Sequence, residues 1–237
     1  MKKIIIDNRM RLEEKNKLES LGYKIIELNS SGNVYQEISS HTDIFCTKII
    51  NNLIVEPSQF QLIKKHIQRD INIIKGKLSL KKTYPEDVGY NACIIGNYAI
   101  HNFQYTDSKI KEILQRENYN LINVKQGYTK CSIAVIDDRS LITADKGLYN
   151  ELMKYNFDIL FLNYKLNIKL INEGEFSTMN GFIGGAISRI GNNVFISGDL
   201  NKIDKNNQIK NFIKKRNLNI ISFSELDVID YGGIIEI

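Results

Sequence analysis

Apolar and polar positions in the first third of the chain follow one order of elements: two strands, a helix and a third strand. Residues 43–49 are apolar and β-branched, and a polar turn separates them from a second short apolar run. A helical spacing of apolar residues follows, and then another apolar run. The predicted elements are a strand at 43–49, a turn at Asn51-Asn52, a strand at 53–55, a helix opened by Pro57 with Phe60, Ile63 and Ile67 on one face, and a strand at 71–74.

The same ββαβ order returns three more times along the chain. The predicted second strands start at Leu53, Tyr98, Leu141 and Val194, so that successive starts are separated by 45, 43 and 53 residues. Periods of this length are typical of propeller-like and solenoid arrays. The three further units are predicted as strands 92–95, 98–100 and 121–124 with a helix capped by Thr106; strands 131–135, 141–143 and 159–162; and strands 182–190, 194–197 and 218–223.

The two ends of the chain supply the parts of a fifth unit. Residues 233–237 form one predicted strand, and 2–6 form another, which is followed by a helix with Leu12, Leu18 and Leu21 and by a strand at 24–28. Pairing of the two terminal strands would close the array and remove an exposed sheet edge. We therefore expect an α/β fold, a five-bladed pseudo-symmetric ββαβ propeller, in one domain spanning residues 1–237. An ordinary α/β sandwich with accidental repetition is the alternative.

Composition and charge narrow the class of protein. The chain has 32 basic and 27 acidic residues, a net charge of +5, and its basic residues are spread out rather than grouped, which disfavours nucleic-acid binding. Three cysteines without paired spacing indicate free thiols in a reducing compartment. No apolar run is long enough to span a bilayer. We expect a cytoplasmic protein with a small-molecule substrate, and a homodimer is one oligomeric state that the sequence allows.

The starts of the first strands would converge near the axis of such a ring. They place His41, Cys131 and several carboxylates at one concave mouth. A thiol near an imidazole is the requirement for nucleophilic cysteine catalysis, because the thiolate is the nucleophile and histidine can hold or return the proton. On a strand, Asp43 would share a face with His41. The segments at the mouth are 40–43, 88–91, 126–131, 180–182 and 230–233.

The remaining polar and thiol residues have simpler interpretations. Cys46 and Cys93 are expected in the core, away from any pocket. Asp145 and Asp199 are expected as helix N-caps, and His66 as a surface residue, whereas His101 has no clear assignment. The cysteines and histidines lack metal-ligand spacing and no phosphate-binding glycine loop follows a strand, so no metal or organic cofactor is expected.

Two short motifs resemble the guanidino-group-modifying enzymes, the pentein superfamily. His41-Thr42-Asp43 resembles the His-x-Asp motif of that family, and the segment 127–132 resembles its glycine-containing stretch before the nucleophilic cysteine. The two motifs lie two units apart, as they do in the family. The resemblance implies a five-unit ring that is circularly permuted relative to arginine and agmatine deiminases.

The sequence departs from this family at two positions. Where the family commonly has Glu-Gly-Gly, this chain has Asp230-Tyr231-Gly232-Gly233, with tyrosine in place of the glutamate. Where arginine-specific enzymes place an aspartate, this chain has Asn180. The resemblance therefore implies a branch distinct from the arginine deiminases, for which free arginine is not the preferred substrate.

The resemblance implies a cysteine-dependent hydrolase or amidinotransferase acting on a small amidine or guanidino-like group. Cys131 would be the nucleophile and His41 the acid and base, with substrate contacts from Asp43, Asp230 and Asn180. One alternative is a non-catalytic ring comparable to the ribosome anti-association factor, because a fold does not fix a function. A substrate outside the guanidino class is a further alternative.

Overall fold

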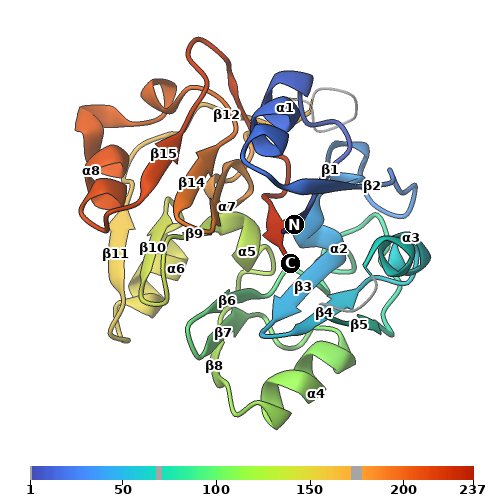
Figure 1. Ribbon diagram of the computed structural model, residues 1–237. Helices are drawn as coiled ribbons and strands as arrows, with labels where there is room; N and C mark the ends of the chain where they lie inside the picture. The colour runs from blue at the N-terminus through green and yellow to red at the C-terminus, as the bar shows by residue number, and fades with distance from the viewer. Residues whose placement is uncertain (1, 68–70, 172–177) are drawn as a thin grey trace.

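Five three-stranded sheets surround a central axis in the computed structural model, which describes residues 2–67, 71–171 and 178–237. Figure 1 shows short helices α5 and α7 near the middle of the ring and longer helices such as α3, α4 and α8 at its periphery. Each sheet is one ββαβ unit. The predicted five-unit ring is therefore confirmed.

In every sheet the second strand is central, antiparallel to the first and parallel to the third. A parallel connection needs a crossover, which the peripheral helices supply. The sheets, each given from first to third strand, are β3 (Cys46–Ile49), β4 (Asn52–Val55) and β5 (Asn72–Lys75); β6 (Cys93–Ile95), β7 (Tyr98–His101) and β8 (Asn120–Asn123); β9 (Ile133–Val135), β10 (Ser140–Thr143) and β11 (Asp158–Phe161); β13 (Ile187–Ile190), β14 (Asn193–Ile196) and β15 (Asn219–Ile221); and β17 (Ile235–Glu236), β1 (Lys3–Asp7) and β2 (Lys24–Leu28).

Side-chain caps fix where several crossover helices begin. The Asp107 carboxylate accepts a hydrogen bond from the Lys109 backbone N–H at 2.7 Å, so Asp107 is the N-cap and the prediction of Thr106 is wrong. The predicted caps Asp145 and Asp199 are confirmed, and His66 is exposed as expected. The helices are α1 (Leu12–Ser20), α3 (Phe60–His66), α4 (Ser108–Arg116), α6 (Lys146–Leu152) and α8 (Gln208–Lys214), with 3₁₀ turns η1 (Gln36–Ile38), η2 (Leu200–Lys202) and η3 (Lys205–Asn207).

Three first strands begin later than the sequence predicts. Short helices α2 (Thr42–Phe45), α5 (Thr129–Ser132) and α7 (Ile183–Ala186) occupy the positions where strands were expected. Continuous apolar runs have no strand alternation, so periodicity alone cannot separate a buried helical turn from a buried strand. The consequence for the site is that Asp43 and Cys131 lie on helical turns at the ring axis.

A small additional sheet lies outside the fivefold repeat. Strands β12 (Ile168–Lys169) and β16 (Val228–Ile229) pair in parallel, and the sequence analysis missed both. Lys169 also forms a bridge with Asn180, and its carbonyl accepts a hydrogen bond from the Asp230 N–H at 2.8 Å. This sheet therefore fixes the backbone of two predicted site residues.

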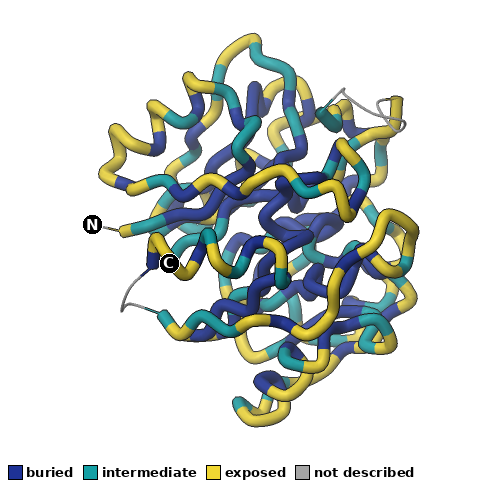
Figure 2. Tube along the Cα trace, turned by 90° about the vertical axis from the view of Figure 1, so that its right-hand side faces the viewer, coloured by how far each residue is buried: buried dark blue, intermediate teal, exposed yellow. Residues whose placement is uncertain are grey.

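The apolar core follows the isoleucine-rich second strands. Ile4, Ile5 and Ile6 on β1 and residues 53–55 on β4 are completely buried. Figure 2 shows buried backbone through the middle of the molecule and exposed backbone mainly at its margins. Within the described residues, no helix is long and apolar enough to cross a membrane.

The ring is closed by the two ends of the chain. β17 pairs with β1 in antiparallel register, with Ile4 opposite Glu236 and Ile5 opposite Ile235. The Glu236 carboxylate also pairs with Lys2 at 2.7 Å, and its carbonyl accepts a hydrogen bond from the Lys48 ammonium at 2.6 Å. The predicted pairing of the terminal strands is confirmed.

Deletion of residues 233–237 should destabilise the ring. The truncation exposes the edge of β1 and removes one buried and two partly buried isoleucines, a loss of about 3 kcal/mol or more. For a chain of this length the melting temperature should fall by roughly 6–12 °C in a thermal unfolding experiment followed by circular dichroism. Leu12→Ser, which changes a side chain that is 72% exposed, is the control and should leave the melting temperature unchanged. Equal stability of the truncated and full-length chains would contradict closure by β17.

Candidate active site

A cavity of about 230 Å³ contains four of the five residues that the sequence selected. His41, Cys131, Asn180 and Asp230 all line it, although they come from four different units of the ring. Asp43 does not line this cavity but lines a second one of about 410 Å³. The first cavity is lined by Tyr35, Glu37, Ile38, His41, Tyr84, Tyr128, Cys131, Leu170, Met179, Asn180, Phe182 and Asp230.

A single buried amide holds the turn that carries Cys131. The Asn91 side-chain oxygen accepts hydrogen bonds from the backbone N–H groups of Lys130 at 2.9 Å and Cys131 at 3.2 Å. Its amide nitrogen donates to the Cys131 Sγ at 3.0 Å and to the Asp43 carbonyl at 2.9 Å. The sequence placed Asn91 in a segment at the mouth of the ring but did not select it. Asn91 both orients the thiol and supplies a donor that favours its ionised form.

The environment of the Cys131 thiol opposes ionisation despite this donor. Burial raises the pKa of Cys131 well above its ordinary value, and the negative charges of Asp43 and Asp230 raise it further. The unliganded protein therefore carries a neutral thiol at neutral pH. Fast reaction with thiol reagents, which a free thiolate would give, is not expected of the unliganded protein.

Asp43 is a buried carboxyl group beside the Cys131 thiol. Among the described residues neither of its carboxylate oxygens has a hydrogen-bond partner. Burial raises the pKa of Asp43 to about 6, although the positive charge of Lys130 acts in the opposite direction. The prediction that Asp43 and His41 share a strand face is wrong, because α2 begins at Thr42. An unpartnered carboxylate is costly to bury, so a cation near Asp43 would be stabilised.

His41 lies between two carboxylates. Its Nε2 is 3.8 Å from Asp7 Oδ2, and its Nδ1 is 3.7 Å from Asp230 Oδ1. The histidine is completely buried, and within the described part of the chain neither ring nitrogen forms a hydrogen bond. The imidazole ring therefore has a carboxylate on each side. The sequence analysis missed Asp7, whose only signal was a carboxylate directly after a continuous apolar strand.

Asp7 is fixed by a network of its own. Its carboxylate accepts hydrogen bonds from the Arg9 Nε at 3.0 Å, the Arg9 Nη2 at 2.7 Å and the Ser40 hydroxyl at 2.8 Å. Burial alone would favour the neutral acid, but the Arg9 hydrogen bonds and the nearby His41 outweigh it and hold the pKa of Asp7 below its ordinary value. Asp7 is therefore a permanent negative charge beside His41 at neutral pH.

Asp230 is positioned by backbone donors and by close contact with two glycines. Its oxygens accept hydrogen bonds from the N–H groups of Gly232 at 2.9 Å and Phe182 at 2.7 Å. A Cβ on Gly185 would lie 1.7 Å from Asp230 Oδ1, and a Cβ on Gly232 would lie 2.4 Å from the His41 Cβ. The absence of side chains at these positions therefore allows the carboxylate and the imidazole to approach each other.

Tyr231 occupies the position where the resembled family has glutamate, but its side chain takes no part in this cavity. Its buried hydroxyl lies near Arg11 and Glu14, whose charges act on it. The carboxylate beside His41 comes instead from the preceding residue, Asp230. The departure from the family motif therefore shifts the acidic group by one position.

Aromatic side chains form much of the cavity wall. The Tyr128 ring lies 5.7 Å from that of Tyr84 and 5.9 Å from that of Phe182, between centroids. The Tyr128 hydroxyl donates a hydrogen bond to Asp87, which fixes the ring in place. Asn180 contributes an uncharged amide to the same cavity.

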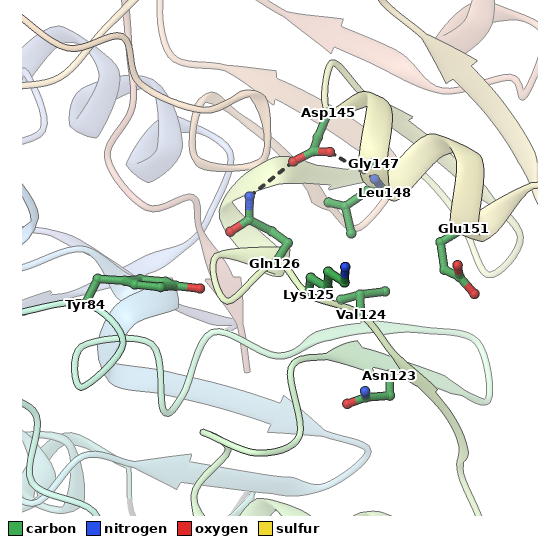
Figure 3. Close-up of a pocket in the computed structure, with 9 residues that line it drawn as sticks. All are labelled: Tyr84, Asn123, Val124, Lys125, Gln126, Asp145, Gly147, Leu148 and Glu151. Carbon is green, nitrogen blue, oxygen red and sulfur yellow. Dashed lines mark hydrogen bonds between the residues drawn. The ribbon is translucent and has the colours of Figure 1, made fainter.

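A larger groove of about 680 Å³ lies beyond Tyr84 and is shown in Figure 3. Its Asp145 carboxylate caps α6 through the Leu148 N–H and accepts a hydrogen bond from the Gln126 amide at 3.1 Å. The groove contains no cysteine or histidine among its lining residues. It shares Tyr84 with the cavity that contains Cys131.

The other buried histidine and the other two cysteines lie in environments that fit structural roles. His101 bonds to Thr106 Oγ1 at 2.6 Å and to the Gly127 carbonyl at 2.8 Å, and burial lowers its pKa to about 4. Cys93 is completely buried, and burial raises its pKa to about 12. Cys46 is also buried but lines the second cavity, so the expectation that it lies away from any pocket is wrong. In the described ranges, no group of three or more His, Cys, Asp or Glu side chains is arranged to hold a metal ion.

Asp43→Asn should make Cys131 more reactive. Loss of a nearby negative charge lowers the thiol pKa, and about 1.4 kcal/mol of relieved repulsion increases the thiolate fraction about tenfold. The rate of alkylation by iodoacetamide at pH 8, measured by peptide mass spectrometry at Cys131, should rise accordingly. Asp138→Asn is the matched control, because Asp138 is an exposed carboxylate that lines the same second cavity. An unchanged rate in Asp43→Asn would show that the two groups do not interact.

Asp7→Asn should destabilise the fold in a pH-dependent way. Because its folded pKa is lowered, Asp7 stabilises the protein above its unfolded pKa of about 3.9, and this contribution is lost as pH falls through the folded value. Removing one partner of the buried Arg9 pair should cost about 3 kcal/mol at pH 7. Urea unfolding of both proteins should show a difference that narrows towards pH 3. The same difference at both pH values would contradict a charge-based role.

Solved structures with this fold include enzymes that act on guanidino compounds. A Pseudomonas aeruginosa dimethylarginine dimethylaminohydrolase complexed with citrulline is 13% identical, with 94% of this chain and 91% of that chain covered and a TM-score of 0.56. An amidinotransferase from the saxitoxin pathway of Microseira wollei is 13% identical, with 94% and 88% covered and a TM-score of 0.54. The agmatine deiminase of C. jejuni is 12% identical, with 92% and 74% covered and a TM-score of 0.53.

These similarities show the fold alone, which is the pentein fold of five ββαβ units closed by β1 and β17. Comparison with curated proteins gave no match. A family model does match, over residues 5–235, and it therefore includes almost the whole ring and every residue discussed in the cavity. This chain belongs to that family, the family of unknown function DUF6873.

Proposed function

We propose that this protein is a cysteine-dependent hydrolase or amidinotransferase that acts on a small amidine or guanidino group. One observation carries the proposal: Cys131, His41 and Asp230 line one cavity, and the Asn91 amide donates a hydrogen bond to the Cys131 sulfur. A nucleophile, a proton carrier beside carboxylates and a donor to the nucleophile are the parts that covalent C–N cleavage needs.

The proposed reaction has two stages. First, the Cys131 sulfur bonds to the central sp² carbon of the substrate and its proton passes to His41. The C–N bond then breaks, and His41 gives that proton to the departing amine. Second, a water molecule adds to the same carbon and gives a proton to His41. The S–C bond breaks, and the proton returns to the Cys131 sulfur. One water is consumed and one amine is released; in an amidinotransferase an acceptor amine replaces the water.

A cationic substrate would change the charge that acts on the Cys131 thiol. Burial raises the pKa of Cys131, and the negative charges of Asp43 and Asp230 raise it further. An amidinium or guanidinium group near these carboxylates would offset their charge and stabilise the thiolate. Binding of the substrate would therefore favour the Cys131 thiolate, which is the nucleophile. Without substrate, the thiol would stay neutral and unreactive.

The comparisons support this proposal through the fold. The solved structures of this fold include a dimethylarginine dimethylaminohydrolase, an amidinotransferase and an agmatine deiminase. The names of these proteins indicate that they act on dimethylarginine, on an amidino group and on agmatine. A shared fold does not fix the activity, so the proposal rests on the residues of the cavity.

A non-catalytic binding protein is the second candidate function. The observation that favours it is the raised pKa of the buried Cys131 thiol, which also fits a structural cysteine. The ring would then bind a partner without chemistry, as the ribosome anti-association factor does. Within the described residues the ring nitrogens of His41 form no hydrogen bond, which argues against this alternative, because a purely structural buried histidine would be expected to have hydrogen-bond partners.

Cys131→Ser should abolish turnover without unfolding the protein. Because a neutral serine hydroxyl is a far weaker nucleophile, the release of amine or urea from amidines and guanidines should fall on the order of a thousandfold or more. Cys93→Ala changes a buried thiol outside the cavity and serves as the control, with activity expected to persist. Circular dichroism should show the same fold in all three proteins. Equal activity of Cys131→Ser and wild type would exclude the covalent mechanism.

A further inference from the structure

The wall of the Cys131 cavity is less polar than the groups proposed to react. Apart from the groups that carry the proposed chemistry, its lining is mostly aromatic or aliphatic. Phe182 and Met179 are 37% and 57% exposed, which places them where the cavity meets solvent. The apolar and aromatic members of the wall are Tyr35, Ile38, Tyr84, Tyr128, Leu170, Met179 and Phe182.

No lysine or arginine is among the twelve described residues that line the cavity. Two basic side chains that act on the buried carboxylates have other partners: the Arg9 guanidinium binds Asp7, and the Lys130 ammonium donates to the Gly184 carbonyl at 3.0 Å and lines the second cavity. Residues 172–177, which the structure does not describe, contain no lysine or arginine in the sequence. The described lining of the cavity therefore contains two acidic residues, Glu37 and Asp230, and no lysine or arginine, and its histidine already lies between Asp7 and Asp230.

This distribution of charge affects which substrates can bind, according to the part of the substrate that does not react, its tail. A ligand carboxylate would leave water without a cation to pair with and would face the carboxylates of the cavity. An aliphatic or aromatic tail would instead gain contact with the Tyr84, Tyr128 and Phe182 rings. The same rings favour a positive charge at their faces. Discrimination against a carboxylate follows from the unpaired charge and is expected to be large.

We infer that the substrate is an amidine or guanidine whose remaining part is apolar and carries no carboxylate. The inference rests on the proposed function, since it describes the part of the substrate that does not react. A volume of about 230 Å³ lies below the range of roughly 300–1,000 Å³ typical of sites for drug-sized ligands, which limits the enclosed part to a small tail.

Three compounds test the inference by removing one charged group at a time. Arginine has a carboxylate and an amine, agmatine lacks the carboxylate, and n-butylguanidine lacks both. Isothermal titration calorimetry on Cys131→Ser measures binding without turnover. We expect n-butylguanidine to bind at least tenfold more tightly than arginine, with agmatine also tighter than arginine. Arginine binding as tightly as n-butylguanidine would overturn the inference.

Two variants test whether the wall is responsible, each made in the Cys131→Ser protein. Phe182→Ala should weaken n-butylguanidine binding at least fivefold. Phe161→Ala is the matched control, because the Phe161 ring stacks on Tyr149 away from the cavity and its loss should leave affinity unchanged. Met179→Lys should raise arginine affinity relative to n-butylguanidine by supplying a cation at the rim, whereas Met179→Leu should not. If Phe182→Ala leaves the affinity for n-butylguanidine unchanged, and Met179→Lys leaves the affinity for arginine relative to n-butylguanidine unchanged, the inference is overturned.

Turnover by wild type, measured on the same compounds, separates the two proposals. Turnover of arginine that exceeds turnover of n-butylguanidine, and that Cys131→Ser abolishes, would overturn the inference and leave the proposed function standing. The expected binding order without turnover of any compound would support the inferred ligand class and count against catalysis. Failure of all three compounds to bind would overturn the inference.

Discussion

The pairing of β17 with β1 is the interaction on which the geometry of the candidate site depends. β1 ends at Asp7, and the segment that leads into β17 contains Asp230 and Gly232. When the two strands pair, these carboxylates lie on either side of His41, which belongs to the neighbouring unit. Closure of the ring and assembly of the histidine environment are therefore one structural event.

Buried charge sets the resting state of the cavity. Asp7 is balanced by Arg9, and Asp230 accepts hydrogen bonds from backbone N–H groups, whereas neither Asp43 oxygen has a hydrogen-bond partner among the described residues. Burial raises the pKa of Cys131, and the negative charges of Asp43 and Asp230 raise it further. A cation beside these carboxylates would offset the negative charge that opposes ionisation of the Cys131 sulfur.

Part of the apolar wall lies directly beside the groups proposed to react. The groups proposed to react come from short turns near the axis, where hydrogen bonds from Asn91 and close approach at Gly185 and Gly232 fix their positions. The apolar wall contains Tyr128 and Phe182, which are the N-cap residues of α5 and α7, and Tyr84 from the segment between β5 and β6. Two of the three rings are therefore positioned by the same axial turns as the groups proposed to react.

The sequence determined the repeat, the strand order and the identity of most residues at the axis. Its second strands are continuous apolar runs at near-regular spacing, so the ring and its closure could be predicted from local pattern alone. The tertiary structure decided which polar groups meet. Asp7, Asn91 and the shift from Tyr231 to Asp230 could not be predicted, because each depends on side-chain distances between different units. Likewise, α2 and α5 replace predicted strand starts because apolar runs at the axis carry no periodicity that separates a helical turn from a strand, and packing between units makes that choice.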